Sequence, residues 1–314
     1  MNHSRRFVVL QAEVATALRE QRAVVALEST IISHGMPYPR NLETARDLEQ
    51  VVRSAGAVPA TIAILDGSFR VGLSADELEQ LATGTDVMKA SRRDLGIAFA
   101  SRRPAATTVA ATMIGAHAAG IRVFATGGTG GVHRGVETTM DVSADLQELA
   151  RTPVAVVSAG VKSILDIRRT LEYLETFGVP VYGLRTEEFP AFYTRHSGLP
   201  VPLVVESVAE LAAALNAQWD AGIRSGALVA TPIPEGDELQ HGYIEAIIER
   251  AVAEAEREAI SGKQLTPFLL GRIVELSGGR SLEANVALVR NNARVAAQLA
   301  QALEADAAAA ENDR

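Results

Sequence analysis

The 314-residue chain contains no cysteine. This absence excludes disulfide bonds, metal sites built on thiolates and cysteine nucleophiles. Long hydrophobic runs are also absent, since none approaches the roughly 20 apolar residues that a membrane-spanning helix needs. The first ten residues, MNHSRRFVVL, lack the pattern of a secretory signal. We therefore expect a cytoplasmic protein with no membrane partner.

Lysine is scarce, because the 30 basic residues include only Lys89, Lys162 and Lys263. The difference between lysine and arginine matters because arginine stays protonated, whereas a desolvated lysine can lose its proton and attack a carbonyl group. Lys162 lies just after an apolar run, 154–157, that is typical of a buried strand. Lys263 lies in a polar turn, and we interpret it as a solvated surface residue. Lys162 is therefore the candidate nucleophile.

The charge balance is acidic, with a formal net charge of −8 and no basic stripe. We therefore expect no nucleic-acid partner. A small anionic substrate remains compatible, because a local pocket can be positive on an acidic protein. The hydrophobic share of 47% is that of an ordinary globular protein. Without internal repeats or a clear linker, residues 1–314 are predicted to form one catalytic domain.

Strand-like and helix-like segments alternate along the chain to about residue 235. The predicted strands are 23–27, 58–65, 123–125, 154–157, 179–184 and 227–230. The predicted helices are 41–54, 75–82, 107–119, 143–150, 163–177 and 208–221, with further helices at 242–260, 267–277 and 282–303. This pattern predicts an α/β fold with three α/β/α layers, a largely parallel or mixed central sheet and additional C-terminal helices.

The C-terminal helices have no strands between them, so we expect them to cover one edge of the sheet or to form an oligomer contact. The alanine-rich segment 304–314 is of low complexity and is predicted to be a frayed tail.

Polar residues follow three of the predicted strands. Glu28 comes after the first strand, the glycine-rich segment 126–135 after another, and 158–160 after a third. In open α/β sheets, ligands bind outside the carboxyl ends of the strands. The three loops are therefore predicted to converge on one pocket, which favours an enzyme.

Two of these features have alternative interpretations. Glu28 follows an apolar run, so partial burial would suit it to general acid catalysis, although it could instead cap the following turn. The loop 126–135 could hold phosphate oxygens on its backbone N–H groups, with His133 as a further donor. It matches neither common phosphate-binding motif, so a glycine-rich turn without a ligand is the alternative.

Asp141 and Asp145 are four residues apart and enter a predicted helix through Ser143. Two carboxylates placed in this way could supply hard oxygen ligands for Mg²⁺ or Mn²⁺. The alternative is a capping serine with acidic neighbours, which is a common arrangement at the start of a helix.

Ten segments together resemble a known family. They are ALESTIISHGMP (26–37), VPATIAI (58–64), KASRRDL (89–95), TTVA (107–110), FATGGTGGVHRG (124–135), DVSADLQEL (141–149), SAGVKSILD (158–166), EYLETFGVPV (172–181), TPFLL (266–270) and LVRNN (288–292). Through them the chain resembles the pseudouridine-5′-phosphate glycosidase family over about residues 20–300. Motifs of this length and number are specific.

The resemblance implies a role for particular residues. Lys162 corresponds to the nucleophile that forms an imine with C1′ of ring-opened ribose 5-phosphate, and Glu28 to the proton donor. Asp141 corresponds to the ligand of one Mn²⁺ per subunit, with other divalent metals as alternatives. The implied substrate contacts are Lys89, Val109, Ser143, Ala144 and Asp145, with Thr126, His133 and Asn285 as further phosphate or sugar contacts. The resemblance also implies a homotrimer.

The implied reaction is the reversible cleavage of pseudouridine 5′-phosphate to uracil and ribose 5-phosphate, by a hydrolase or lyase of pseudouridine and nucleotide catabolism. The bond to be broken joins two carbons, so the usual two-carboxylate scheme, in which an acid protonates a leaving oxygen, does not fit. Uracil C5 is an enamine-like carbon, and it can leave in a retro-Mannich step when Lys162 supplies an iminium at C1′. Glu28 would transfer the proton at C5 or on the edge of the uracil ring.

Two alternative functions remain when the residues are considered without the family resemblance. One is a Schiff-base aldolase that acts on another sugar phosphate. The other is a non-catalytic regulator that binds a sugar phosphate, although the chain shows no DNA-binding module.

Overall fold

The computed structural model describes residues 7–260 and 262–312. Within these residues a central sheet of eleven strands runs in the order β1-β4-β3-β2-β7-β9-β13-β11-β12, and β6 joins β5 to β3. Its strands are β1 (Val8–Leu10), β2 (Val24–Leu27), β3 (Val58–Leu65), β4 (Ser68–Val71), β5 (Met88–Ala90), β6 (Ala105–Thr107), β7 (Val123–Ala125), β9 (Ala155–Ser158), β11 (Val181–Leu184), β12 (Leu203–Val205) and β13 (Ala227–Ala230). A separate small sheet pairs β8 (Val132–His133) with β10 (Leu165–Asp166).

The sheet is mixed and largely parallel. The stretch from β3 through β2, β7, β9, β13 and β11 to β12 is parallel, whereas β4 and β6 pair antiparallel with β3. All eight residues of β3 are buried, as expected for a strand with helices on both of its faces. The predicted sheet type is therefore confirmed.

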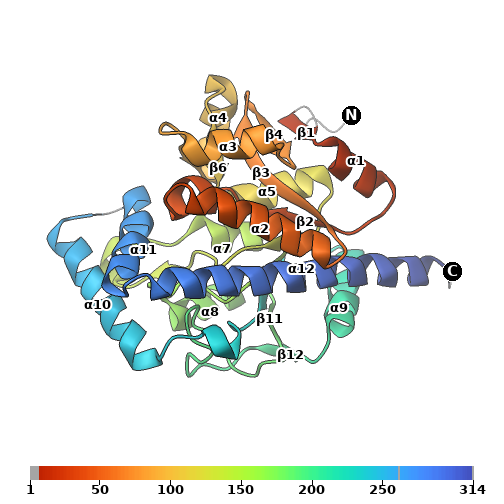
Figure 1. Ribbon diagram of the computed structural model, residues 1–314. Coiled ribbons are helices and arrows are strands. Elements are labelled where there is room, and N and C mark those ends of the chain that lie inside the picture. The colour runs from red at the N-terminus through yellow and green to blue at the C-terminus, as the bar shows by residue number, and fades with distance from the viewer. Residues whose placement is uncertain (1–6, 261, 313–314) are drawn as a thin grey trace.

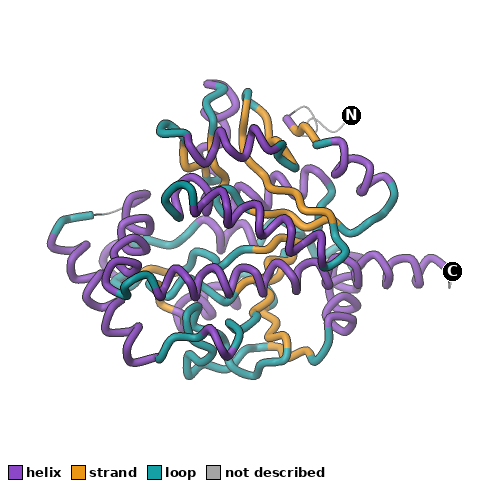
Figure 2. Tube along the Cα trace, in the orientation of Figure 1, coloured by secondary structure: helices purple, strands orange, loops and turns teal. Residues whose placement is uncertain are grey.

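Helices cover both faces of the sheet, so the three-layer fold is confirmed (Figure 1). Helices α2 (Arg40–Ser54) and α12 (Arg280–Asn312) pack against each other in front of the strands, while α5 (Val109–Ala119) and α7 (Ala144–Leu149) lie behind them. The strands form a band between these layers (Figure 2). The remaining helices are α1 (Ala12–Arg19), α3 (Ala75–Thr83), α4 (Leu95–Ser101), α6 (Val136–Thr139), α8 (Ile167–Thr176), α9 (Val208–Asp220), α10 (His241–Arg257) and α11 (Leu265–Leu276).

Short helical turns connect several of these elements: η2 (Ile31–Gly35), η3 (Arg92–Asp94), η4 (Glu235–Asp237) and η5 (Gly262–Gln264). Lys263 lies in η5, but its side chain is outside the described part of the structure. Among the described residues, no helix combines the length and the apolar character needed to cross a membrane.

Two predicted helices begin later than expected. Thr107 belongs to β6, and α5 begins at Val109 because the Thr108 hydroxyl caps it by accepting from the Ala111 N–H. Helix α8 begins at Ile167, since the Asp166 carboxylate accepts from the Arg169 N–H at 3.0 Å. In both places a capping side chain fixes the start of the helix.

Helix α12 lies over the centre of the sheet, so the edge position expected for the C-terminal helices is wrong for this helix. It contacts β2, β7 and β9 as well as α2 and α9. Its inward face carries small residues, which allow a close approach to the strands: Ala293, Ala296, Ala297 and Ala300 are all buried.

The tail predicted to be frayed from residue 304 is helical as far as Asn312. Alanine has the highest helix propensity, which favours continuation of the helix. The Asn216 amide also donates to the Asp306 carboxylate at 2.8 Å, which ties this last part of α12 to α9. Residues 313 and 314 lie outside the described residues.

Candidate active site

The three polar loops meet at the carboxyl ends of neighbouring strands, as predicted. Strand β7 lies between β2 and β9 and is parallel to both, so the carboxyl ends of all three strands point the same way. A cavity of about 230 Å³ opens there, lined by Glu28 after β2, by Thr126 after β7 and by Lys162 beyond β9. This position is where open α/β sheets bind ligands.

The half-buried Glu28 carboxylate is held by two hydroxyl groups. Thr126 donates to Oε1 and Thr30 donates to Oε2. The following turn η2 has Thr30 at its N-cap position and no side-chain cap, so the structure does not support the capping interpretation of Glu28. The two hydroxyls fix the orientation of a carboxylate that lines the cavity, where it can exchange a proton with a bound molecule.

Lys162 is hydrogen-bonded to the glycine-rich loop through both its side chain and its backbone. Its Nζ donates to the Gly128 carbonyl at 2.7 Å, and its backbone N–H donates to the Thr129 carbonyl at 3.0 Å. Lys162 is half-buried, and Lys89 from β5 lines the same cavity. The two lysines that sequence analysis separated from Lys263 therefore share one site with Glu28.

The glycine-rich loop needs its glycines because other groups approach it closely. A Cβ on Gly130 would lie 2.1 Å from Ser143 Oγ, and one on Gly128 would lie 2.7 Å from the Phe192 ring. Asp145 is only 6% exposed and anchors the loop to α5. Its Oδ1 accepts from the Ala110 N–H and its Oδ2 from the Gly130 N–H, each at 2.9 Å.

This arrangement shows how Ser143 and Asp145 are used at the start of α7. Ser143 Oγ accepts from the Asp145 N–H at 3.2 Å, so Ser143 caps α7, while the Asp145 carboxylate binds backbone N–H groups. The described residues contain no cluster of three or more histidine, aspartate or glutamate side chains that could enclose a metal ion. The bonds of Ser143 and Asp145 therefore match the capping interpretation, whereas Asp141 as a metal ligand stays a prediction.

A second cavity of about 830 Å³ adjoins the first and shares Lys89, His133 and Ser143 with it. Asp141 and the exposed Ala144 line this second cavity. The shared wall thus combines a lysine, a histidine and the capped N-terminus of α7, which is a suitable environment for an anionic group.

His133 Nε2 lies 3.9 Å from Asp141 Oδ2. Burial lowers the pKa of His133 below its ordinary value, while the negative charge of Asp141 opposes this effect and the positive charge of Lys162 adds to it. The ring is therefore mainly neutral near pH 7.

The C-terminal helices α11 and α12 also contribute to the wall of the cavity. Asn285 on α12 lines the cavity, as does the buried Val109 at the start of α5. Sequence reasoning missed most of this wall, although the segment 266–270 had contributed to the family resemblance. The lining residues not predicted are Thr30, Ile31, His34, Gly35, Ser91, Thr108, Leu165, Phe192, Tyr193, Thr266, Pro267, Leu270, Val274, Ser281 and Leu282.

Asn292 on α12 was also missed as a functional residue, and it supports the site from behind. It is fully buried, and its Nδ2 donates to the Thr126 carbonyl at 2.8 Å. Its Oδ1 accepts from the Thr231 hydroxyl at 2.6 Å. Because Thr126 in turn binds Glu28, Asn292 links α12 to the position of the acidic group.

Comparison with known proteins assigns the chain to a family. A family profile described as "Indigoidine synthase A like protein" matches residues 13–302. Pseudouridine-5′-phosphate glycosidase from Caldanaerobacter subterraneus subsp. tengcongensis is 61% identical over 94% of this chain and 96% of the relative. The protein of the same name from Deinococcus radiodurans is 62% identical over 94% of each chain. The chain belongs to the pseudouridine-5′-phosphate glycosidase family.

Solved structures agree with this family assignment. Prealnumycin C-glycosynthase AlnA, in complex with ribulose 5-phosphate, superposes with a TM-score of 0.90 and 42% identity, covering 97% of this chain and 99% of that one. An indigoidine synthase A-like protein from Thermotoga maritima superposes with a TM-score of 0.87 and 36% identity, with the same coverage.

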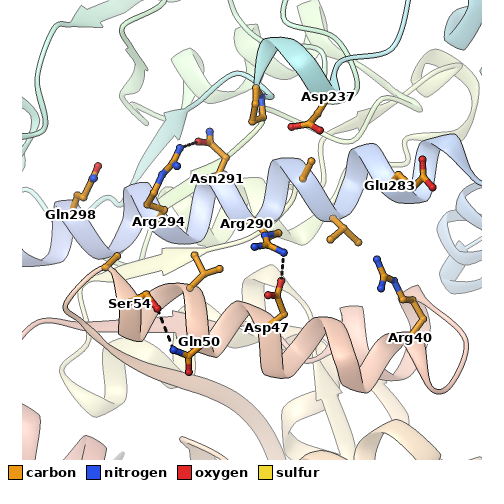
Figure 3. A pocket seen from close by; sticks show the side chains of 15 residues that line it. Arg40, Asp47, Gln50, Ser54, Asp237, Glu283, Arg290, Asn291, Arg294 and Gln298 are labelled. Atoms are coloured by element: carbon orange, nitrogen blue, oxygen red, sulfur yellow. Dashed lines mark hydrogen bonds and ion pairs between the residues drawn. The ribbon is translucent and has the colours of Figure 1, made fainter.

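A larger cavity of about 860 Å³ lies elsewhere, between α2 and α12 (Figure 3). We call it the helix groove. Its polar side chains bind one another: Arg290 pairs with Asp47 at 3.1 Å, and Arg294 donates to Asn291 at 2.6 Å. None of the site residues implied by the family resemblance lines this groove.

Proposed function

We propose that this enzyme reversibly cleaves the C–C glycosidic bond of pseudouridine 5′-phosphate, giving uracil and ribose 5-phosphate. The observation that carries the proposal is the meeting of Glu28, Lys89 and Lys162 in one cavity at the strand ends. The names of the relatives support the reaction. The related C-glycosynthase was solved with a sugar phosphate, which supports this class of substrate.

Lys162 is proposed to act as the nucleophile. Its amine would bond to C1′ as the C1′–O4′ bond of the ribose ring opens, and the proton lost by nitrogen would go to O4′. The nitrogen lone pair then forms the C1′=N iminium as the C1′–C5 bond to uracil breaks. Water hydrolyses the iminium, releasing ribose 5-phosphate and the free amine.

Glu28 is proposed to deliver the proton that uracil C5 needs when this bond breaks. The hydroxyls of Thr30 and Thr126 hold the carboxylate in place, so little reorientation is needed during the reaction. In the synthetic direction the same carboxylate would remove that proton from C5. Thr126 would also offer its oxygen lone pairs to the sugar.

The substrate phosphate is proposed to bind where the two cavities meet. Lys89 and His133 line both cavities, and Ser143, Ala144 and Asp145 form the start of α7 beside them. Val109 at the first position of α5 has a backbone N–H without an intrahelical partner, which suits an oxygen acceptor. Asn285 would contact the sugar or base from α12.

Mn²⁺ is proposed to bind at Asp141. The surroundings of Asp141 suit a hydrated ion, because one half-exposed carboxylate beside His133 provides few protein ligands. Ions of this kind often keep several waters and bind through one or two carboxylates together with substrate phosphate oxygens. A bound ion would neutralise phosphate charge at this end of the site.

A homotrimer is proposed as the assembly. Apolar side chains on the edge strand β12 support a subunit contact, because Leu203 is 43% exposed and Val204 is 41% exposed. Light scattering on the purified protein should give a molecular mass three times the 33.2 kDa of one chain. The mass of a monomer would contradict the proposal.

The function is tested by measuring uracil release from pseudouridine 5′-phosphate, with and without Mn²⁺. Release with formation of ribose 5-phosphate supports the proposal, and uracil combined with ribose 5-phosphate should give the reverse reaction. Turnover of a ketose phosphate without uracil release would favour a Schiff-base aldolase instead. Tight binding of sugar phosphates without any turnover would favour a regulator.

A further inference from the structure

Phe192, in the segment between β11 and β12, has a backbone conformation that its side chain disfavours. Its φ of 65° lies in the left-handed region, where a bulky residue is an outlier. Glycine adopts this region without steric cost. A need for the backbone shape alone would therefore be met better by glycine. The phenylalanine indicates that the ring itself is required at this position.

The ring of Phe192 lies against the glycine-rich loop at the wall of the active-site cavity. A Cβ atom on Gly128 would lie 2.7 Å from both Cδ2 and Cε2 of the ring, and one on Gly127 would lie 3.7 Å from Cε2. The ring thus fills the space that a side chain on Gly128 would need. Phe192 is only 2% exposed and makes an edge-to-face contact with Tyr193, so packing fixes the ring in this place.

The backbone of Phe192 contacts the segment that carries the proposed nucleophile. Its N–H donates to the Ala159 carbonyl at 3.1 Å. Lys162 follows three residues after Ala159, and its Nζ donates to the Gly128 carbonyl at 2.7 Å. Phe192 therefore contacts both the segment of Lys162 and the residue that accepts the hydrogen bond of the Lys162 side chain.

The Gly128 carbonyl can hold the lysine only where the loop places it. On either side of Gly128 the loop is fixed by backbone bonds, because the Ala159 N–H donates to the Gly127 carbonyl at 2.9 Å and the Thr129 N–H donates to the Gly160 carbonyl at 3.1 Å. Gly128 itself has no side chain to restrict its backbone. Packing against the Phe192 ring supplies this restriction.

We propose that Phe192 is a positioning residue for the nucleophile, because its ring supports the Gly128 peptide whose carbonyl holds the Lys162 amine. This inference rests on the proposed function, in which that amine attacks C1′ of the sugar. Attack requires a defined geometry, so a small displacement of the reacting group slows the reaction. Loss of the ring should therefore slow the chemical step more than it weakens substrate binding.

Two substitutions separate the ring from the backbone conformation. Phe192→Leu removes the ring but keeps an apolar side chain. We expect kcat for uracil release to fall about tenfold or more in this variant, with a change in KM of less than about threefold. Phe192→Gly suits the left-handed backbone but also lacks the ring, so its kcat should fall at least as far.

Phe69 in β4 provides a matched control. It is 3% exposed, it makes an edge-to-face contact with Phe99, and a Cβ atom on Gly115 would lie 3.1 Å from its Cδ1. It lines neither cavity of the site. Phe69→Leu should therefore lower the melting temperature about as much as Phe192→Leu does, but leave kcat unchanged.

Labelling of lysines tests the contact without turnover. Formaldehyde and cyanoborohydride methylate free amines, and mass spectrometry of peptides measures Lys162 and Lys89 separately. Without the ring, the Gly128 carbonyl holds the amine less well. In Phe192→Leu we therefore expect labelling of Lys162, relative to Lys89, to be about two- to tenfold faster, as for the loss of one hydrogen bond. Phe69→Leu should not change this ratio.

An unchanged kcat or an unchanged labelling ratio in Phe192→Leu would overturn the inference. Equal losses of kcat in Phe192→Leu and Phe69→Leu would also overturn it, because the effect would then follow from stability. Full activity of Phe192→Gly would show that only the backbone conformation is needed. If the unmodified enzyme releases no uracil, the proposed function fails, whereas the labelling ratio still tests whether Phe192 holds Lys162 in place.

Discussion

The helix groove and the active-site cavity differ in size and in how their polar groups are held. The groove measures about 860 Å³ and the cavity about 230 Å³. In the groove, Arg290 and Asp47 neutralise each other. In the cavity, Lys162 binds a backbone carbonyl and Glu28 binds two hydroxyls, so neither group meets an opposite charge in these bonds. How polar groups are paired therefore indicates function better than volume does.

The largest effect is expected at Lys162. Lys162→Arg keeps a positive charge but removes the amine that can form an imine, so uracil release should fall about a thousandfold or more. Arg290→Lys in the helix groove makes the reverse exchange and should leave the rate unchanged. Both rates are measured at saturating pseudouridine 5′-phosphate, with circular dichroism as a check of folding.

Borohydride provides a direct test of the same lysine. Added together with ribose 5-phosphate, it should inactivate the enzyme and leave a pentose phosphate on the peptide that contains Lys162. An adduct on Lys89, or an active Lys162→Arg enzyme, would show that another lysine is the nucleophile.

Glu28→Gln tests the proposed proton donor and is expected to have the second largest effect on activity. The amide keeps the shape of the side chain but cannot transfer the proton, so kcat should fall roughly a hundredfold or more with little change in KM. Asp47→Asn in the helix groove removes a carboxylate of similar exposure and should not change kcat. A normal kcat with a raised KM in Glu28→Gln would make Glu28 a binding residue.

Metal removal tests Asp141. Chelation should abolish uracil release, and Mn²⁺ should restore it. Asp141→Asn should weaken Mn²⁺ binding about ten- to hundredfold, as measured by calorimetry without substrate, since a carboxylate ligand is lost. Full activity in excess chelator would contradict the assignment.

Adjacent residues on α12 allow the closest comparison of the two cavities. Asn292 donates to the Thr126 carbonyl behind the active site, whereas Asn291 lines the helix groove. Asn292→Ala should lower kcat about tenfold and destabilise the fold by about 1–3 kcal/mol, because buried partners lose their hydrogen bonds. Asn291→Ala should change kcat less than twofold. Equal kinetic effects would show that α12 does not position Thr126.

The smallest effect on activity is expected at Glu49, a largely buried carboxylate of α2 outside both cavities. Burial raises the pKa of Glu49. The Thr61 hydroxyl donates a hydrogen bond to Glu49 Oε1 at 2.6 Å, and this bond opposes the effect of burial. The folded protein therefore keeps this proton to higher pH than the unfolded chain does. Stability consequently falls as pH rises from the ordinary glutamate range through the raised pKa.

Glu49→Gln should thus raise the melting temperature at pH 7 and have no effect near pH 4, with kcat unchanged at either pH. Thermal unfolding at the two pH values measures the difference. Equal stabilisation at both would show that ionisation of Glu49 is not the cause.

Local sequence patterns predicted several elements closely. The apolar run at Val58–Leu65 coincides with β3, and the helix predicted at 75–82 corresponds to α3, whose start the structure shows to be fixed by a capping box of Ser74 and Glu77. Such patterns work because strand burial and helix caps depend on neighbours within a few residues. The starts of α5 and α8 were placed too early because the capping roles of Thr108 and Asp166 were not recognised in the sequence.

The sequence by itself determined which residues can do chemistry: a lysine after a buried strand, a glutamate after another, and a glycine-rich loop after a third. Only the tertiary structure decided which side chains hold these residues in place. Thr126 reaches Glu28, and Asp145 spans from α5 to the glycine-rich loop. Asn292 is 166 residues from its partner Thr126. Such contacts depend on the order of the strands and the path of α12 across them, which no local pattern encodes.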